Sequence, residues 1–238
     1  SPNIEPRVGG RRADLLLLHY TGMICCEKAI DWLSRPESKV SCHYVVAEDG
    51  AVTQMVAEEQ RAWHAGQSHW AGETDINSCS IGIEIHNAGH ACGYPDFTEP
   101  QMQAVVRLSA DIVARHAIPP QRVLAHSDVA PARKIDPGER FDWRRLAEAG
   151  VGLWLQPEPV RDDGVVLDLG ARSEQVAEVQ HLLRAYGYGL DVTGVLDQPT
   201  AFVLRAFQLH WRPARVDTRL DASTLETARR LVGSGRAT

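Results

Sequence analysis

Ser80-Ile-Gly-Ile-Glu-Ile-His-Asn87 is the stretch on which the fold of this chain depends. Apolar residues alternate along it, as they do in a β-strand whose successive side chains point to opposite faces. The three isoleucines therefore share one face, which should pack into a core, and Gly82, Glu84 and His86 share the other. Because a glycine leaves room for another group to approach, Glu84 is a candidate to line a cleft. The alternative is a face that simply meets water.

Other predicted strands and helices surround this stretch in the first part of the chain. The patterns predict a buried strand over 14–20, a hairpin of 42–48 and 51–56 around Asp49-Gly50, a helix over Glu99–His116, and shorter helices over Cys26–Leu33 and Asp142–Ala149. Such a mixture points to an α/β or an α+β domain.

A second region follows residues 155–164, Leu-Gln-Pro-Glu-Pro-Val-Arg-Asp-Asp-Gly. Two prolines and a cluster of charges are typical of a linker. We therefore expect a larger domain over 1–154, a linker over 155–164 and a smaller domain over 165–238.

The smaller domain contains a weak internal repeat. A helix is expected to run to Tyr186 from Ser173, which is placed as its N-cap. Residues 192–200 and 216–224 then share the pattern Leu-Asp-x-x-Thr, and the aspartate of each copy is placed to cap the helix that follows, Asp197 in the first and Asp221 in the second. The pattern predicts three helices.

Composition excludes several classes of protein. The chain has 238 residues, 44% of them hydrophobic and 24% charged, which is ordinary for a globular protein. A net charge of −6 argues against nucleic acid or an anionic membrane as the main partner. The longest apolar runs, such as Leu15–Leu18, are too short to span a bilayer, and no export signal is visible. No Gly-x-Ser-x-Gly motif or phosphate-binding glycine loop is present.

Five cysteines are an odd number, and no Cys-x-x-Cys pair occurs among them. A thiolate zinc cluster or a redox motif is therefore not supported. We expect mostly free, partly buried thiols, with one bridged pair as the alternative.

The segment 125–138, Ala-His-Ser-Asp-Val-Ala-Pro-Ala-Arg-Lys-Ile-Asp-Pro-Gly, concentrates groups suited to chemistry. It holds an imidazole (His126), an ammonium group (Lys134) and a carboxylate (Asp136). In an extended segment the last two would share a face, and two prolines stiffen the loop around them. The loop offers at most two zinc ligands, so a third must come from elsewhere.

Histidines are the natural source of that ligand, since neutral imidazole is the commonest zinc ligand. The candidates besides His126 are His19, His43, His64, His69, His86 and His90. His19 lies at the end of the predicted strand 14–20, where α/β sheets usually bind ligands. For any single histidine, however, a structural or solvated role is the competing interpretation. The set of His19, His126 and Asp136 has no local spacing signature.

Five motifs occur in an order that resembles the type 2 family of zinc-dependent N-acetylmuramoyl-L-alanine amidases. They are Leu18-His-Tyr-Thr-Gly22, Ser41-Cys-His-Tyr44, Ala62-Trp-His-Ala-Gly66, Asn77-x-x-Ser-Ile-Gly-Ile-Glu-Ile85 and His126-Ser-Asp-Val-Ala-Pro-x-Arg-Lys-x-Asp-Pro-Gly138. The resemblance covers about residues 13 to 154. Residues 165 to 233 are similar to the small helical peptidoglycan-binding domain, through Gly187-Tyr188, Thr193-Gly194, Asp197, Thr200 and Ala206-Phe-Gln208.

The resemblance implies an α/β fold with a mixed central sheet flanked by helices, followed by a small three-helix domain. It implies one Zn²⁺ per chain, bound by His19, His126 and Asp136 with water in the fourth position. Glu84 would be the catalytic base, and Lys134 would stabilise the oxyanion. Further residues of the motifs are expected to bind substrate: Tyr20, His43, Trp63, His64 and Asn87. His86 departs modestly from the family pattern, and its contact with substrate is left open.

The activity so implied is hydrolysis of the amide bond between N-acetylmuramic acid and L-alanine in peptidoglycan or muropeptides. One alternative is a non-catalytic peptidoglycan recognition module, because some proteins with this fold lack a metal ligand. Another is a zinc peptidase that cuts within the stem peptide. The expected compartment is the bacterial cell envelope, specifically the periplasm, with the cytoplasm as the alternative.

Overall fold

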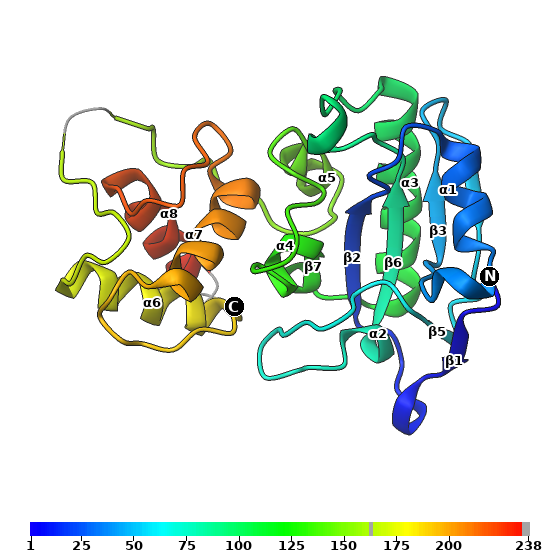
Figure 1. Cartoon of the computed structure of the whole chain (residues 1–238), viewed down its shortest axis with the longest axis horizontal. Coiled ribbons are helices and arrows are strands. Elements are labelled where there is room, and N and C mark those ends of the chain that lie inside the picture. The colour runs from blue at the N-terminus through cyan, green and yellow to red at the C-terminus, as the bar shows by residue number, and fades with distance from the viewer. Residues whose placement is uncertain (162–163, 235–238) are drawn as a thin grey trace.

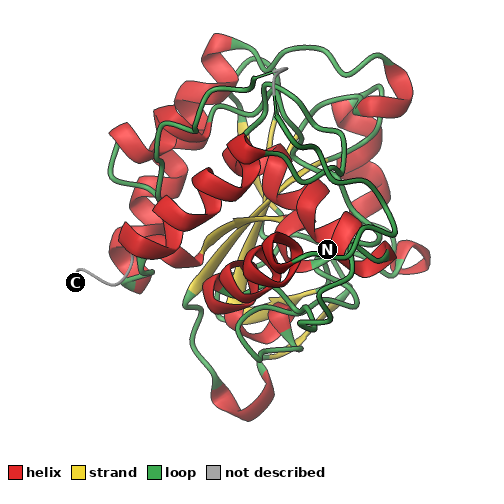
Figure 2. Cartoon of the chain, turned by 90° about the vertical axis from the view of Figure 1, so that its left-hand side faces the viewer, coloured by secondary structure: helices red, strands yellow, loops and turns green. Residues whose placement is uncertain are grey.

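The computed structural model describes residues 1–161 and 164–234 (Figure 1). An α/β part carries the N-terminus, and the helices α6, α7 and α8 gather beside it. Turned by 90°, the molecule presents these helices in front of the yellow strands (Figure 2). The α/β fold with an added helical region is thus confirmed.

A five-stranded sheet with the order β4-β3-β6-β2-β7 forms the centre of the α/β part. β6 is parallel to β2 and β3, β2 is parallel to β7, and β4 is antiparallel to β3. β1 and β5 form a separate antiparallel ladder. The strands are β1 Ile4–Pro6, β2 Leu15–Tyr20, β3 Tyr44–Val46, β4 Val52–Gln54, β5 Gln60–Ala62, β6 Ser80–Ile85 and β7 Val123–Ala125. The predicted central strand and hairpin are both present.

Helices cover the sheet and follow the predicted bounds closely. The α-helices are α1 Cys26–Leu33, α2 Ile76–Cys79, α3 Glu99–His116, α4 His126–Val129, α5 Trp143–Glu148, α6 Glu174–Tyr186, α7 Gln198–Trp211 and α8 Ala222–Ser234. Short 3-10 helices lie at Val8–Gly10, Pro36–Ser38, His90–Cys92 and Pro120–Arg122. α3 begins where Thr98 accepts a hydrogen bond from the Gln101 backbone N–H at 3.3 Å. It packs on the isoleucine face of β6, as the alternation of that strand predicts.

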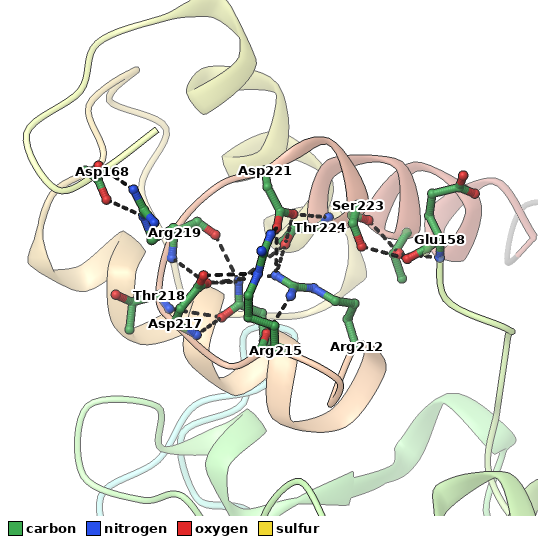
Figure 3. A network of polar contacts seen from close by, with 12 residues as sticks. Glu158, Asp168, Arg212, Arg215, Asp217, Thr218, Arg219, Asp221, Ser223 and Thr224 are labelled. Atoms are coloured by element: carbon green, nitrogen blue, oxygen red, sulfur yellow. Dashed lines mark hydrogen bonds and ion pairs between the residues drawn. The ribbon is translucent and has the colours of Figure 1, made fainter. Parts of the chain in front are cut away.

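The helical region repeats one polar unit twice. Gln180 on α6 accepts from the backbone N–H groups of residues 193 and 194 and donates to the Thr200 hydroxyl. Gln208 on α7 accepts from the backbone N–H groups of residues 217 and 218 and donates to the Thr224 hydroxyl. Figure 3 shows the second copy, in which a buried arginine, Arg212, joins the network. The repeat seen in the sequence is therefore a repeat of structure.

The N-caps expected for the three helices of this region are confirmed. Ser173 accepts from the Val176 backbone N–H, and Asp197 and Asp221 accept from the backbone N–H of the threonine three residues further on. Each aspartate satisfies a donor that the first turn of its helix leaves free.

The two regions do not separate as cleanly as the sequence suggests. One cluster of buried apolar side chains runs from Leu15 and Leu17 of β2 through Trp70 into all three helices of the helical region. The expected linker is also packed, because the Glu158 N–H donates to the Thr227 hydroxyl at 3.0 Å and the Glu158 carbonyl accepts from Ser223. Residues 162–163 of that linker lie outside the described part. The prolines and charges of this segment therefore coincide with the boundary between the two regions, although Glu158 within it packs against the helical region.

All five cysteines lie in the described part of the chain and are free thiols. Cys26, Cys42 and Cys79 are buried, so the expectation of free, partly buried thiols is confirmed and the bridged pair is not formed. Across residues 1–161 and 164–234, no helix has the length and apolar character needed to cross a membrane.

Candidate metal centre and active site

Three neighbouring strands bring two of the predicted metal ligands, His19 and His126, together with Glu84 to one edge of the sheet. In the parallel pair β2 and β6, His19 lies opposite Glu84. In the parallel pair β2 and β7, Leu18 lies opposite Ala125, so the next residues, His19 near the end of β2 and His126 directly after β7, lie side by side. This is the carboxyl edge of parallel strands, where α/β sheets bind ligands.

His19, His126 and Asp136 present three ligand atoms to one point, and all three residues are buried. The two Nδ1 atoms are 2.8 Å apart, and Asp136 Oδ2 lies 3.0 Å from His126 Nδ1 and 3.3 Å from His19 Nδ1. Ligands at about 2.0–2.1 Å from a tetrahedral zinc ion are about 3.3 Å apart. The triangle, made of two nitrogens and one oxygen, therefore fits three corners of such a site and leaves the fourth to water or substrate.

The protonation states of these groups also suit a divalent cation. Burial, and then the neighbouring His126, lower the pKa of His19 to about 4. Burial alone would raise the pKa of Asp136, but the neighbouring His126 and His19 hold it far below its ordinary range. At neutral pH the site therefore offers a neutral imidazole and an ionised carboxylate, the forms that bind metal.

Neighbours set which ring nitrogen of each histidine is free. The Ser80 hydroxyl donates to the Ile76 carbonyl at 2.6 Å, so it accepts from His64 Nε2 at 3.2 Å. His64 Nδ1 is then an acceptor for His19 Nε2–H at 3.0 Å, which leaves the lone pair of His19 Nδ1 for the metal. His126 Nε2–H donates to the Ala65 carbonyl at 3.1 Å, with the same result for its Nδ1.

Gly82 makes this arrangement possible. A Cβ at this position would lie 2.5 Å from His64 Nδ1, closer than any side chain tolerates. The group that the glycine was expected to admit is thus His64, which reaches across β6 to hold His19.

Glu84 lines the same pocket as His126 and Asp136. Its Oε2 is buried and lacks a hydrogen-bond partner among the described residues. Burial, and then the charge of Asp136, raise the pKa of Glu84 well above its ordinary range, and Lys134 opposes that shift. A desolvated, unpaired carboxyl group of this kind can hold or take up a proton.

A pocket of about 290 Å³ opens above these groups. His64, Glu84, His126, Lys134 and Asp136 form its polar floor. Its remaining lining comes largely from α1, the loops beside it and Trp63: Tyr20, Thr21, Met23, Ala29, Trp32, Leu33, Val40, Ser41 and Trp63. The pocket thus combines a few converging polar groups with apolar side chains, as sites for small ligands do.

Two of the five expected substrate-binding residues do not reach this pocket. His43 is fully buried, where its Nδ1 accepts from the Gly82 backbone N–H at 2.9 Å. Asn87 is also buried and donates to the Pro95 carbonyl at 2.8 Å. Neither residue lines the pocket, and both form hydrogen bonds with the backbone instead. Tyr20, Trp63 and His64 do line the pocket.

His86 is buried away from the pocket lining as well, with Nε2 at 3.0 Å from Glu48 and Nδ1 at 3.1 Å from the Thr21 hydroxyl. The sequence reasoning missed the apolar wall from α1 and its neighbours, notably Met23, Trp32 and Val40. Trp32 is 43% exposed and so sits on the outer side of its helix, which only the structure reveals.

Comparison with known proteins bears directly on this site. Residues 9–139 match the family model described as N-acetylmuramoyl-L-alanine amidase, and residues 172–227 match the model of a peptidoglycan binding domain. The chain belongs to the N-acetylmuramoyl-L-alanine amidase family. The expectation of an amidase, a hydrolase of this family followed by a second domain, is confirmed.

Members of the family resemble the chain over nearly its whole length. N-acetylmuramoyl-L-alanine amidase AmiD of Escherichia coli is 36% identical over 93% of this chain and 83% of its own. A structure of AmiD in complex with anhydro-N-acetylmuramic acid-L-Ala-D-gamma-Glu-L-Lys, described as its substrate, has a TM-score of 0.79 at 33% identity and covers 97% of this chain and 92% of that one. AmpDh3 of Pseudomonas aeruginosa has a TM-score of 0.80 at 30% identity, covering 98% and 96%.

Proposed function

We propose that this chain uses one Zn²⁺ ion to hydrolyse the amide bond between the lactyl group of N-acetylmuramic acid and L-alanine. The observation that carries the proposal is the buried Glu84 Oε2, which has no hydrogen-bond partner in the described part of the chain, in the pocket that also holds His126 and Asp136 of the buried metal-ligand group. A recognition module needs no such base. The substrate of AmiD, a muramyl peptide, supports the choice of bond.

His19, His126 and Asp136 would hold the zinc ion, as the fit of their ligand atoms supports. When bound, zinc supplies positive charge that lowers the pKa of a water molecule to about 7 and polarises the carbonyl to be attacked. Three protein ligands keep the fourth position open to water or substrate, as catalytic zinc sites require.

Glu84 would transfer the proton of the attacking water, and Lys134 would stabilise the negative charge that forms on the carbonyl oxygen. Glu84 accepts the proton of the attacking water and later delivers it to the leaving amine of L-alanine. Lys134 lies in the pocket floor, where its ammonium group can stabilise the negative oxygen of the tetrahedral intermediate. The products are the muramyl sugar and a stem peptide with a free N-terminal L-alanine.

The proposed substrate is peptidoglycan or the muropeptides derived from it. The match to a peptidoglycan binding domain supports a substrate of this class, and for that reason we place the protein in the bacterial cell envelope, in the periplasm. A preference for small soluble muropeptides would instead favour the cytoplasm.

Product analysis by mass spectrometry tests this function. The zinc-loaded full chain is incubated with soluble anhydro-muropeptides and, separately, with intact sacculi. Release of intact peptides that begin with L-alanine supports the amidase. Cuts within the stem peptide would indicate a peptidase, and zinc-loaded protein without any product would indicate a recognition module. The ratio of the two rates ranks soluble against polymeric substrate.

Glu84→Gln is the matched variant for this assay. It keeps the size of the side chain but removes the base, so we expect kcat to fall about 10²–10⁴-fold. Zinc content after dialysis should stay at one ion per chain, because Glu84 is not a ligand. Near-normal turnover of this variant would refute the role of Glu84. As the contrasting control, His126→Ala should lose zinc.

A further inference from the structure

Asp128 is a buried carboxylate that joins the two regions of the molecule. Its side chain is 1% exposed, and both oxygens accept short hydrogen bonds. Tyr188 Oη–H donates to Oδ1 at 2.6 Å, and His210 Nδ1 lies 2.7 Å from Oδ2. The Ala125 backbone N–H donates to Oδ2 at 2.8 Å. Two of the three donors that offset the burial of this charge come from the helical region.

The element that carries Asp128 also carries one metal ligand and touches another. α4 is a single turn that begins at His126, and Asp128 holds its start through the Ala125 N–H. Within the same turn, the Ser127 N–H donates to the Asp136 backbone carbonyl at 3.0 Å. A shift of α4 would therefore move His126 and Asp136 together. So short a turn has little intrinsic stability, and its position depends on tertiary contacts.

A second line of contacts reaches His126 from the same side. Its Nε2–H is held by the carbonyl of Ala65, which opens the loop that leads to Trp70. Trp70 is buried against the rings of Tyr186 and Tyr188, with centroid separations of 5.5 and 5.0 Å. The Ala71 N–H donates to a helical-region carbonyl, that of Gly187, at 2.8 Å.

The close fit of this interface explains the glycines around Tyr188. A Cβ at Gly187 would lie 2.6 Å from the Trp70 ring, and one at Gly189 would lie 2.6 Å from the His69 ring. On α7, the His210 ring stacks on Trp143 of α5 with a centroid separation of 3.8 Å. The Gly187-Tyr188 motif thus faces the catalytic part and is unavailable to a wall polymer.

We propose that the helical region is a positioning element of the metal centre, in which Tyr188 and His210 hold Asp128 and thereby fix His126 and Asp136. Neither residue touches metal or substrate, so they are positioning residues. The proposal rests on the metal site of the proposed function, but it does not depend on which bond the enzyme cuts.

Single substitutions in the full chain test this role. Tyr188→Phe and His210→Leu each remove one donor to Asp128. Tyr186→Phe is the matched control, since its ring packs on the same Trp70 and its hydroxyl has no hydrogen bond to Asp128 within the described residues. His210→Asn is the rescue variant, because its amide nitrogen can take the place of the imidazole Nδ1.

Zinc affinity is measured by competition with a chelator, and ligand geometry by the visible absorption spectrum of the Co²⁺-substituted protein. Loss of a partner that orients a ligand typically weakens metal binding 10–100-fold. Because Asp128 acts through the backbone, we expect about a tenfold loss in Tyr188→Phe and His210→Leu with an altered cobalt spectrum. His210→Asn should recover most of the affinity, and Tyr186→Phe should match the wild type.

Thermal unfolding of the metal-free variants separates positioning from plain stability. If Tyr188→Phe and His210→Leu unfold earlier but keep the zinc affinity and cobalt spectrum of the control, the proposal is wrong. Should His210→Leu fail to fold, Tyr188→Phe decides alone, because it removes one oxygen. Both readouts are taken without substrate, so a failure here is distinct from a failure of the amidase assay.

Discussion

At the scale of single residues, the proposed metal ligands are oriented by partners outside the ligand group. His64 holds the outer nitrogen of His19, Ser80 holds His64, and Gly82 provides the space in which His64 lies. Such outer partners fix the ring orientation and the tautomer of a ligand. The orientation of the proposed ligand His19 therefore depends on His64 and on two residues of β6, Ser80 and Gly82.

Gly82→Ala should disturb this chain of contacts. The added methyl group must push the His64 ring away, which breaks its hydrogen bond to His19. We expect zinc affinity to fall about tenfold or more, together with about 1–3 kcal/mol of stability from overpacking. Chelator competition and urea unfolding measure the two effects.

Gly233→Ala is the control for this variant, because a Cβ there meets open space on α8. It should leave both quantities unchanged or slightly raise stability. Unchanged zinc affinity in Gly82→Ala would show that His64 does not orient His19.

At the scale of elements, the two repeated units of the helical region differ in one respect. Asp197 and Asp221 cap α7 and α8 with the same pair of hydrogen bonds, to a threonine N–H and its hydroxyl. Among the described residues, Asp221 alone of the two also pairs with arginines, at 2.6 Å from Arg215 and 3.4 Å from the fully buried Arg212 (Figure 3). The second unit therefore carries a buried charge that the first lacks.

Replacement of these two caps by alanine should reveal that difference. Asp197→Ala loses a cap and should cost about 1 kcal/mol. Asp221→Ala loses the same cap and also leaves the Arg212 charge poorly compensated, so we expect a cost of about 3 kcal/mol or more. Urea denaturation of both variants measures the costs, and equal values would contradict the contribution of the arginine pair.

Glu58 links two other elements, β3 and the end of α3. It accepts from Tyr44 Oη–H at 2.7 Å and contacts Arg115 and His116. Burial opposes ionisation, but the hydrogen bonds from Arg115, His116 and Tyr44 outweigh it and lower the pKa of Glu58 to about 2, from an ordinary value of 4.5. Between about pH 2 and pH 4.5, the native state therefore keeps the Glu58 carboxylate ionised, whereas the unfolded chain binds a proton at this group.

Stability should therefore be highest above pH 4.5 and fall as the pH decreases toward 2, by about 3 kcal/mol from this residue. Glu58→Gln should flatten the loss of unfolding free energy between pH 5 and about 3. Denaturation at a series of pH values tests this, with the exposed neighbour Glu59 changed to Gln as control. An equally steep loss in Glu58→Gln would rule out the assignment.

At the scale of the whole molecule, the catalytic part and the helical region share one apolar cluster. Leu15 and Leu17 of the sheet belong to the same cluster as Phe207 and Leu231 of the helices. Separation of the two parts would expose these side chains to water, at about 25 cal/mol for each Å² of apolar surface. The molecule should therefore behave as one cooperative unit.

Calorimetry tests this cooperativity. We expect a single unfolding transition that zinc moves upward as a whole, since binding to the native state at a thousandfold excess over Kd adds about 4 kcal/mol. Two transitions, of which one ignores zinc, would show that the helical region folds independently.

Local sequence was sufficient for most elements, and the resemblance carried by its motifs singled out the three residues that the structure brings together as a possible metal site. The bounds of α3, the alternation of β6 and the caps at Ser173, Asp197 and Asp221 depend on residues a few positions apart. Periodicity and capping chemistry act over that range. The motifs around His19, Glu84 and His126 were recognisable because each is contiguous in the chain.

Only the tertiary structure decided which side chains meet. His43 and Asn87 lie in motifs but are buried, while Asp128, adjacent to the metal site in sequence, is bound by Tyr188 and His210 from the other region. These partners are separated by 60 and 82 positions, and no spacing rule connects them. The physical reason is that periodicity reflects local backbone geometry, whereas burial and the satisfaction of a buried charge depend on contacts that form only when distant segments pack together.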